Sequence, residues 1–369
     1  MTGRRKIIVF DVSGHGFGHL AQVTPVIQKL IIKIPNIRIV IRSALPSSVI
    51  RSFLDGEIET ATAPPEITPI MCGPSVVNVM ATADGYRSLH ARWDEHLDQE
   101  ATRLSALRPA ILIADVPYLS LAAAKRIGVP AVALCSLNWM DIYRAYCGLR
   151  PEASAILQTI RAAYQAADIF LQPQPHMPMS ELPNRQSIGP IGRIGSNRRV
   201  DIYKALNIPH GKQIVLATFG GIPSDRPLSL PRIPNVQWIA LSGTSSTRTD
   251  ISDFSQLGMK FIDVLASADA VLTKVGYSTF VEAACNGVGL VSAPRPDWPE
   301  AVVLLRWASQ NANFAMTQTA LEDIEGVKDA VSAVLKAPRV LPVPTLGVAE
   351  AFNYIMRVAD LRTSSDGYI

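Results

Sequence analysis

Short apolar runs alternate with helix-like patterns along most of the chain, and this alternation is the main feature of the sequence. Lys6–Val12 and Ile37–Ile41 have the length and the β-branched composition of buried strands. Between them, after a glycine-rich turn, apolar residues recur at helical spacing at Val23, Val26, Ile27 and Leu30. Strands that alternate with helices predict a parallel sheet with right-handed crossovers.

Both halves of the chain repeat this pattern. In the first half we expect a short helix after Pro46, a long helix over residues 84–107, strands over 110–114 and 131–134, and a helix over 119–127. In the second half we expect strands over 213–218, 236–241, 270–273 and 289–292, and helices over 261–267 and 279–286.

The stretch from Gln172 to Arg199 interrupts the alternation, because proline and glycine are dense in it. It predicts a linker over residues 176–199 between an N-terminal domain, 1–175, and a C-terminal domain, 200–345. A last helix over 348–361 is expected to cross back to the first domain. The predicted fold class is α/β, with two Rossmann-like domains facing a central cleft in which a ligand binds at the carboxyl ends of the strands.

Composition narrows the class of protein. With 369 residues, 48% hydrophobic and 18% charged, the chain has enough apolar material for two globular domains. Its formal charge of +4 favours a phosphate-bearing ligand slightly, but basic runs such as Arg4-Arg5-Lys6 are too short to indicate nucleic acid binding.

Cysteine usage and hydropathy predict a cytoplasmic protein. The four cysteines form no CxxC pair, which argues against a zinc site and a disulfide framework: Cys72, Cys135, Cys147 and Cys285. Cys135 lies in an apolar run and is interpreted as a core residue. No signal peptide and no apolar stretch of ~18 residues is evident, so we expect no membrane span, although peripheral membrane contact stays open.

A glycine loop with two histidines follows the first predicted strand: Gly14, His15, Gly16, Gly18 and His19. Glycines permit close approach of a ligand, and the following helix N-terminus attracts an anion, so this is a candidate acceptor or phosphate loop. The spacing differs from the dinucleotide-binding fingerprint. Histidine accepts a proton near neutral pH, which makes His19 a candidate catalytic base. Helix capping is the alternative role for both histidines.

Asp115 directly follows the predicted strand over 110–114, at the carboxyl end of the sheet. From there it could hold His19 in one tautomer, as a buried aspartate does in a catalytic triad. The alternative is a turn or helix-capping role before Pro117, and the sequence does not decide between the two.

The second half offers a donor-binding constellation where a strand ends and a helix begins: Lys274, Gly276, Tyr277, Ser278, Thr279 and Glu282. A diphosphate fits such a helix start, and Glu282 could accept hydrogen bonds from ribose hydroxyls. The alternative is that Thr279-x-x-Glu282 is a capping box, which needs no ligand.

Two further loops follow predicted strands of the second half. Gly220 and Gly221 form a second possible phosphate-approach loop. Arg295, Asp297 and Glu300 lie in a proline-rich turn after a later strand, where their side chains could contact sugar hydroxyls, although the prolines fit a rigid turn equally well.

Taken together, these stretches resemble glycosyltransferases of the GT-B fold, of the MurG and UDP-glycosyltransferase type. They are more similar still to the glycosyltransferase-like N-terminal region of L-arabinokinases and its stand-alone bacterial relatives. The matching passages run in the family's order: Gly14-His15-Gly16-Phe17-Gly18-His19, Ala114-Asp115-Val116-Pro117, Asn138-Trp139-x-Asp141-Ile142-Tyr143, Phe219-Gly220-Gly221-x-Pro223, Lys274-Val275-Gly276-Tyr277-Ser278-Thr279-x-x-Glu282-Ala283, and Pro294-Arg295 with Glu300.

The resemblance implies an inverting, metal-independent glycosyltransferase with no cofactor besides its co-substrate, a nucleotide sugar that is usually a UDP-sugar. It implies that His19 matches the general base, Asp115 its orienting acid, and Glu282 the ribose-binding acid. The partners implied are the nucleotide sugar and a small-molecule or glycan acceptor. The chain departs from the family at Gln22, where relatives usually carry arginine, and near Glu300, where many carry glutamine.

Two other functions fit the same fold. A nucleotide-sugar hydrolase or 2-epimerase would replace the acceptor hydroxyl by water or by the sugar's own carbon. A catalytically silent module would bind the nucleotide sugar without turnover.

Overall fold

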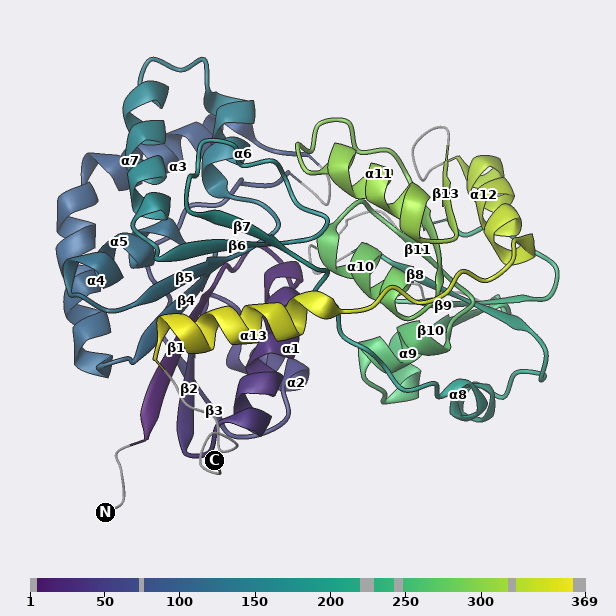
Figure 1. Cartoon of the computed structure of the whole chain (residues 1–369). Coiled ribbons are helices and arrows are strands. Elements are labelled where there is room, and N and C mark those ends of the chain that lie inside the picture. Colours follow the sequence, from purple (N-terminus) through teal and green to yellow (C-terminus); the bar gives the residue numbers. More distant parts are fainter. Residues whose placement is uncertain (1–4, 73–75, 220–228, 242–247, 318–322, 361–369) are drawn as a thin grey trace. The chain divides into compact units, whose positions relative to one another are not determined.

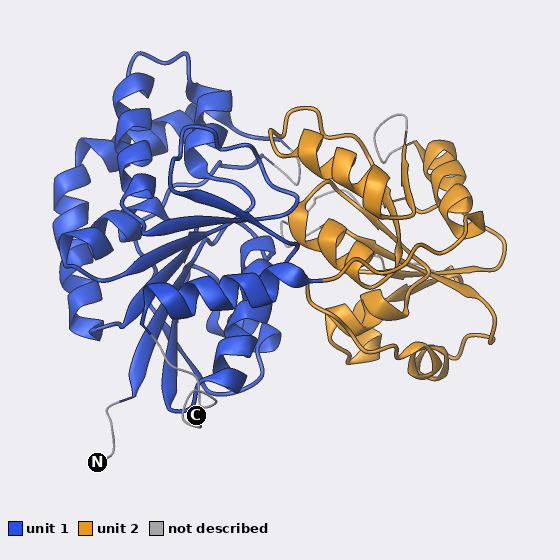
Figure 2. Cartoon of the chain, in the orientation of Figure 1, with its two compact units in different colours: residues 1–72, 76–191, 345–369 blue, residues 73–75, 192–344 orange. Residues whose placement is uncertain are grey.

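The structure is a computed structural model that describes residues 5–72, 76–219, 229–241, 248–317 and 323–360 (Figure 1). The chain forms two compact units (Figure 2). Unit 1 comprises the described residues of Met1–Cys72, Val76–Ile191 and Thr345–Ile369, and unit 2 those of Gly192–Pro344.

Unit 1 is built on a parallel sheet that has seven strands within the described residues, in the order β3-β2-β1-β4-β5-β6-β7. The strands are β1 (Lys6–Val12), β2 (Ile37–Arg42), β3 (Ile58–Ala61), β4 (Ile111–Asp115), β5 (Ala131–Leu134), β6 (Ile169–Pro173) and β7 (Arg185–Ile188). The helices are α1 (Gly18–Lys33), α2 (Ser47–Phe53), α3 (Val79–Ala91), α4 (Trp93–Leu107), α5 (Tyr118–Arg126), α6 (Trp139–Cys147), α7 (Ala153–Gln165) and α13 (Leu346–Val358).

The last helix, α13, belongs to the core of unit 1 and lies beside α1 (Figure 1). Phe352 and Ile355 pack there among the apolar residues of α1 and of strands β1, β2 and β4. The start of α13 contacts the segment after β7 so closely that a Cβ on Gly347 would lie 1.9 Å from the carbonyl oxygen of Gly189. Only glycine permits that approach of two backbones.

Unit 2 is built on a parallel sheet of six strands within the described residues, in the order β10-β9-β8-β11-β12-β13. The strands are β8 (Gln213–Thr218), β9 (Val236–Ala240), β10 (Ile251–Asp253), β11 (Ala270–Thr273), β12 (Gly289–Ser292) and β13 (Phe314–Met316). The helices are α8 (Arg199–Ala205), the 3-10 helix η1 (Phe254–Leu257), α9 (Phe261–Ser267), α10 (Tyr277–Cys285), α11 (Ala301–Asn311) and α12 (Ile324–Lys336).

The strand order of both sheets is that of a Rossmann fold, which confirms the predicted α/β class with two Rossmann-like sheets. The order reverses between β1 and β4 in unit 1 and between β8 and β11 in unit 2. Loops that leave adjacent strands in opposite directions leave room for a ligand at this switch point. The glycine loop follows β1, Asp115 is the last residue of β4, and Lys274 follows β11.

Three elements differ from the sequence-based expectation. The helix expected over residues 84–107 is two helices, because the chain leaves helical geometry at Arg92 (φ −119°, ψ 29°). No glycine or proline marks this break; the rings of His90 and Trp93 stack on Tyr118 of α5 on either side of it. The segment expected to be a linker over 176–199 contains strand β7, and α10 begins at Tyr277, two residues before the expected start.

Candidate active site

The β1–α1 loop is held against the end of β4. The backbone N–H of Ser13 donates to the carbonyl oxygen of Asp115 at 2.7 Å. Gly16 adopts φ +76°, a left-handed conformation that favours glycine. A Cβ on Gly14 would lie 2.9 Å from the Cβ of Ala44. This loop brings His19 into the first turn of α1, at the switch point of the sheet.

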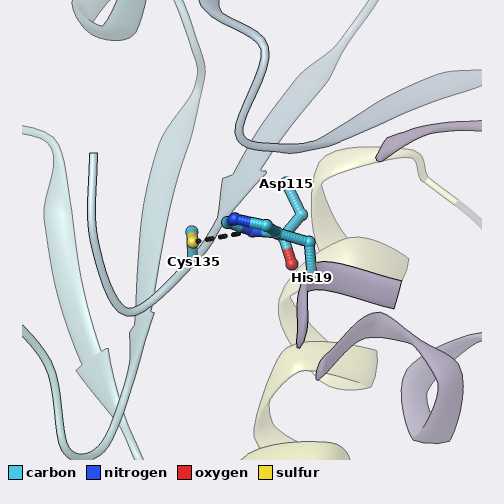
Figure 3. A group of neighbouring side chains, drawn as sticks. All are labelled: His19, Asp115 and Cys135. Carbon is cyan, nitrogen blue, oxygen red and sulfur yellow. Dashed lines mark hydrogen bonds and ion pairs between the residues drawn. The ribbon is translucent and has the colours of Figure 1, made fainter. Parts of the chain in front are cut away.

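His19 and Asp115 form a buried pair (Figure 3). Nδ1 of His19 lies 2.7 Å from Oδ1 of Asp115, within hydrogen-bond distance. Neither residue caps a helix: Phe17 is the N-cap of α1 and Pro117 that of α5, both without a side-chain cap bond. Burial raises the pKa of Asp115, and the charge and hydrogen bond of His19 oppose that rise.

Cys135 follows β5 and contributes a third group to this pair. Its Sγ lies 3.7 Å from Nδ1 of His19, so it is more than the core residue that the sequence indicated. The ligand atoms of His19, Asp115 and Cys135 lie within 4.8 Å of one another, an arrangement that could hold a metal ion. The 2.7 Å separation of Nδ1 and Oδ1 is, however, that of a hydrogen bond, and a metal bound at Nδ1 would have to replace its proton.

Trp139, at the start of α6, packs against both histidines of the glycine loop. Its ring meets His15 and His19 edge-on, with centroid separations of 5.7 and 5.6 Å. The hydroxyl of Tyr164 accepts a hydrogen bond from the Trp139 backbone N–H at 3.0 Å and donates one to the Val116 carbonyl at 2.9 Å. These bonds tie the start of α6 to the chain that follows Asp115.

A carboxylate that the sequence did not single out lies in the same site. Glu66, half-buried in the segment between β3 and α3, accepts hydrogen bonds from Trp139 Nε1 at 2.7 Å and from the Ser13 hydroxyl at 3.0 Å. Burial raises the pKa of Glu66, whereas Trp139, the charge of His19, Ser13 and the Gly14 amide oppose that rise. Because Glu66 is 47 residues from His19 and lies outside any motif, only the fold brings it here.

Cationic groups gather at the start of α10 in unit 2. Lys274 follows β11 and is half-buried; its burial and the neighbouring charge of Arg295 lower its pKa to about 8. Gly276 is the N-cap of α10, with no side-chain cap bond and no acidic residue in the first turn. Ser278 and Thr279, which follow Tyr277, lie in that first turn, where backbone N–H groups have no acceptor within the helix and can bind phosphate.

Arg295 completes this cluster from the loop after β12. Its guanidinium donates to the carbonyl oxygen of Val275 at 3.3 Å and lies over the Trp298 ring at 4.3 Å. The Trp298 indole N–H donates to Glu300 at 3.2 Å. The structure therefore joins Lys274 and Arg295 at one helix start, while Glu300 contacts Trp298 as the N-cap residue of α11.

Glu282 is paired with an arginine that the sequence did not indicate. Both oxygens of its buried carboxylate accept bonds from Arg193, at 2.5 and 3.1 Å. The capping-box alternative is wrong, because Thr279 is the third residue of α10 instead of its N-cap. Gly220 and Gly221, the other predicted phosphate loop, lie outside the described residues.

Comparisons with known proteins agree with this architecture. No family model matches the chain. It is 24% identical over 304 residues to the L-arabinokinase of Arabidopsis thaliana, covering 80% of this chain and 29% of that protein. It is 24% identical over 209 residues to an uncharacterized glycosyltransferase of Methanopyrus kandleri, covering 52% of this chain and 58% of that protein. The chain thus spans less than two thirds of either relative.

Solved structures match nearly the whole chain. The glycotransferase of kitacinnamycin superposes with a TM-score of 0.59 at 17% identity, over 97% of this chain and 95% of that one. A UDP-glucosyltransferase from Polygonum tinctorium gives a TM-score of 0.59 at 13% identity, over 98% and 100%. The spinosyn rhamnosyltransferase SpnG complexed with thymidine diphosphate gives 0.55 at 13%, over 96% and 95%.

The chain has the GT-B fold of glycosyltransferases. The GT-B fold was predicted from ordered short motifs, and the two parallel sheets and the structural neighbours confirm it. None of the helices in the described part of this GT-B protein combines the length and the apolar character needed to cross a membrane.

Proposed function

We propose that the protein is an inverting, metal-independent glycosyltransferase that moves a sugar from a uridine diphosphate donor to an acceptor hydroxyl. The observation that carries the proposal is the 2.7 Å contact between Nδ1 of His19 and Oδ1 of Asp115 at the switch point of unit 1. A base oriented by a buried aspartate is the arrangement that activates a weak hydroxyl nucleophile.

In the proposed reaction, Asp115 accepts a hydrogen bond from the Nδ1–H of His19, which leaves Nε2 unprotonated and able to receive the acceptor's hydroxyl proton. The acceptor oxygen forms a bond to the anomeric carbon from the face opposite the diphosphate, so the configuration inverts. The bond between that carbon and the diphosphate oxygen breaks, and its electron pair leaves with the diphosphate. Asp115 stabilises the imidazolium that results.

The leaving diphosphate gains negative charge as this bond breaks. Lys274, Arg295 and the N-terminus of α10 supply positive charge and N–H donors in unit 2. Protein cations of this kind can stabilise a leaving group without a metal ion. In this proposal Glu282 accepts hydrogen bonds from the ribose hydroxyls through the lone pairs that Arg193 leaves available.

Acceptor-dependent release of nucleoside diphosphate tests the proposal. The protein is incubated with UDP-sugars and with a mixture of phenolic, alcoholic and glycan acceptors, and free UDP and glycosylated product are quantified. We expect UDP release only when an acceptor is present, with equal amounts of product. A series of dTDP-sugars serves as the control for the nucleobase of the donor, since one structural neighbour is complexed with thymidine diphosphate.

Other outcomes assign other functions. UDP release at the same rate without acceptor identifies a hydrolase, or an epimerase that hydrolyses its substrate as a side reaction. A rise in melting temperature with UDP but no turnover on any donor identifies a binding module. No melting-temperature shift with any nucleoside diphosphate at millimolar concentration contradicts the donor site itself.

A further inference from the structure

Glu66 is an ionisable group of the His19 site that the proposed mechanism does not use. It lies between β3 and α3, in the segment over residues 62–78, and reaches into the site from outside the β1–α1 loop. A carboxylate placed among hydrogen-bond donors beside a proposed base affects both the shape and the charge of the site.

Glu66 joins two segments that bound the site. One carboxylate oxygen accepts the Ser13 hydroxyl at 3.0 Å, and Ser13 in turn accepts the His15 backbone N–H at 3.2 Å. The other oxygen accepts Trp139 Nε1 at 2.7 Å. Removing Glu66 therefore breaks a hydrogen-bonded link between the glycine loop and the indole.

The indole of Trp139 transmits the position of Glu66 to the histidines. Tyr164 accepts a hydrogen bond from the backbone N–H of Trp139 at 3.0 Å and Glu66 accepts one from its ring N–H at 2.7 Å, so the residue is held both at its backbone and at its ring. Its edge-on contacts with His15 and His19 are then determined by where Glu66 holds the ring. A ring held in this way limits the orientations that the imidazole of His19 can adopt.

The charge of Glu66 adds to that of Asp115. Groups that face His19 come from four parts of the chain: Asp115 at the end of β4, Cys135 after β5, Trp139 of α6, and Glu66 between β3 and α3, with His15 on the loop of His19 itself. Of these, Asp115 and Glu66 are the carboxylates. A negative charge near His19 favours its imidazolium form, which is the form a general base reaches in the transition state.

We propose that Glu66 is a positioning residue for His19. Glu66 fixes Trp139 and the glycine loop around the imidazole and supplies a second negative charge beside that ring. The catalytic part of this statement rests on the proposed function, whereas the hydrogen-bonded arrangement does not. Two variants separate geometry from charge: Glu66→Gln keeps an oxygen for the indole N–H but removes the charge, and Glu66→Ala removes both.

The first experiment needs no substrate. In ¹⁵N–¹H spectra, the indole N–H signal of Trp139, assigned with Trp139→Phe, is followed in a pH titration of the full chain. We expect the parent signal to titrate with a midpoint above the ordinary glutamate value of about 4.3, because burial raises the pKa of Glu66. In Glu66→Gln the chemical shift of this signal should no longer titrate, and in Glu66→Ala it should move toward the value of a solvent-exposed indole. An unchanged, titrating signal in Glu66→Gln overturns the proposal.

The second experiment measures turnover and donor KM against pH. In Glu66→Gln we expect kcat to fall roughly tenfold, which corresponds to one pKa unit. The acidic limb of the pH profile of kcat should move to lower pH, and donor KM should not change. Glu66→Ala should lose more. The matched control is Glu59→Gln, an exposed glutamate of β3 paired with Arg38, which should behave as the parent. A parent-like profile in Glu66→Gln overturns the catalytic part.

If the parent itself turns over no donor, the proposed function fails, and the spectra still decide whether Glu66 holds Trp139.

Discussion

At the scale of single residues, the ion pair between Glu282 and Arg193 changes what a substitution at Glu282 does. A neutral residue there leaves the guanidinium of Arg193, whose side chain is only 14% exposed, without its carboxylate. Loss of one partner of a buried pair costs stability on its own account. Nucleotide affinity and folding therefore have to be separated in the same experiment.

We predict that Glu282→Gln weakens UDP binding by about 2–3 kcal/mol, the worth of hydrogen bonds to a charged acceptor, and also destabilises unit 2. The double variant Arg193→Met/Glu282→Gln should recover most of the stability, because no charge is then left buried and unpaired, but not the affinity. Calorimetric titration and thermal unfolding of the three proteins check this. Recovery of affinity together with stability would mean that Glu282 serves the ion pair alone.

Lys274 gives the donor site a pH dependence. Its pKa of about 8 in the ligand-free protein means that it is largely neutral above that pH, and a bound diphosphate favours its charged form. Binding must then take up a proton. We predict that UDP affinity is nearly flat below pH 8 and falls with rising pH above it, by up to about tenfold per unit.

Calorimetry in two buffers of different ionisation enthalpy, between pH 7 and 9.5, measures this proton uptake. Lys274→Met is the matched control: it should bind UDP more weakly and show no proton uptake in the same range. A parent protein whose UDP affinity does not change over that range would place Lys274 away from the phosphates.

The sequence was informative about residues that follow strands and uninformative about residues that meet only through the fold. His19 and Asp115 each stand at the carboxyl end of a predicted strand, so the Rossmann order alone predicts that they converge. Glu66 lies in a proline-rich segment and Arg193 in the predicted linker, and no local pattern connects either to its partner. Cys135 was recognised as buried, but burial does not reveal which side chain it contacts.

At the scale of elements, the sequence predicted the bounds of buried strands more accurately than the ends of helices. The predicted strands over 213–218, 270–273 and 289–292 coincide with β8, β11 and β12, since continuous apolar runs mark both edges of a buried strand. The break between α3 and α4 was missed because stacking of His90 and Trp93 on Tyr118 is tertiary. The start of α10 was missed because Thr279 and Glu282 imitate a capping box.

A stability prediction belongs to α13. Phe352 is 7% exposed in the core of unit 1, so Phe352→Ala removes a buried ring and should destabilise that unit by about 3–5 kcal/mol. Asn353→Ala, an exposed position on the same helix, should change stability by less than about 0.5 kcal/mol. Scanning calorimetry of the full chain compares the two. Equal effects would show that α13 does not contribute to the core of unit 1.

At the scale of the whole molecule, two Rossmann sheets divide the proposed work. Unit 1 carries the proposed catalytic base, His19, with its partner Asp115, and unit 2 carries the cationic start of α10. If that division holds, substitutions in unit 1 should change turnover without changing donor affinity, whereas substitutions in unit 2 should change affinity. The central claim is that His19 of unit 1 is the base of a glycosyl transfer.

The most direct test of that claim is a paired measurement of turnover and UDP affinity in His19→Ala, Asp115→Asn and His15→Ala beside the parent protein. We predict that His19→Ala lowers turnover roughly 10²–10⁴-fold while UDP affinity persists, and that Asp115→Asn loses rate through the wrong tautomer with its fold intact. His15→Ala should lose much less. Parent-like turnover in His19→Ala would contradict the account, and a larger loss in His15→Ala would move the base to His15.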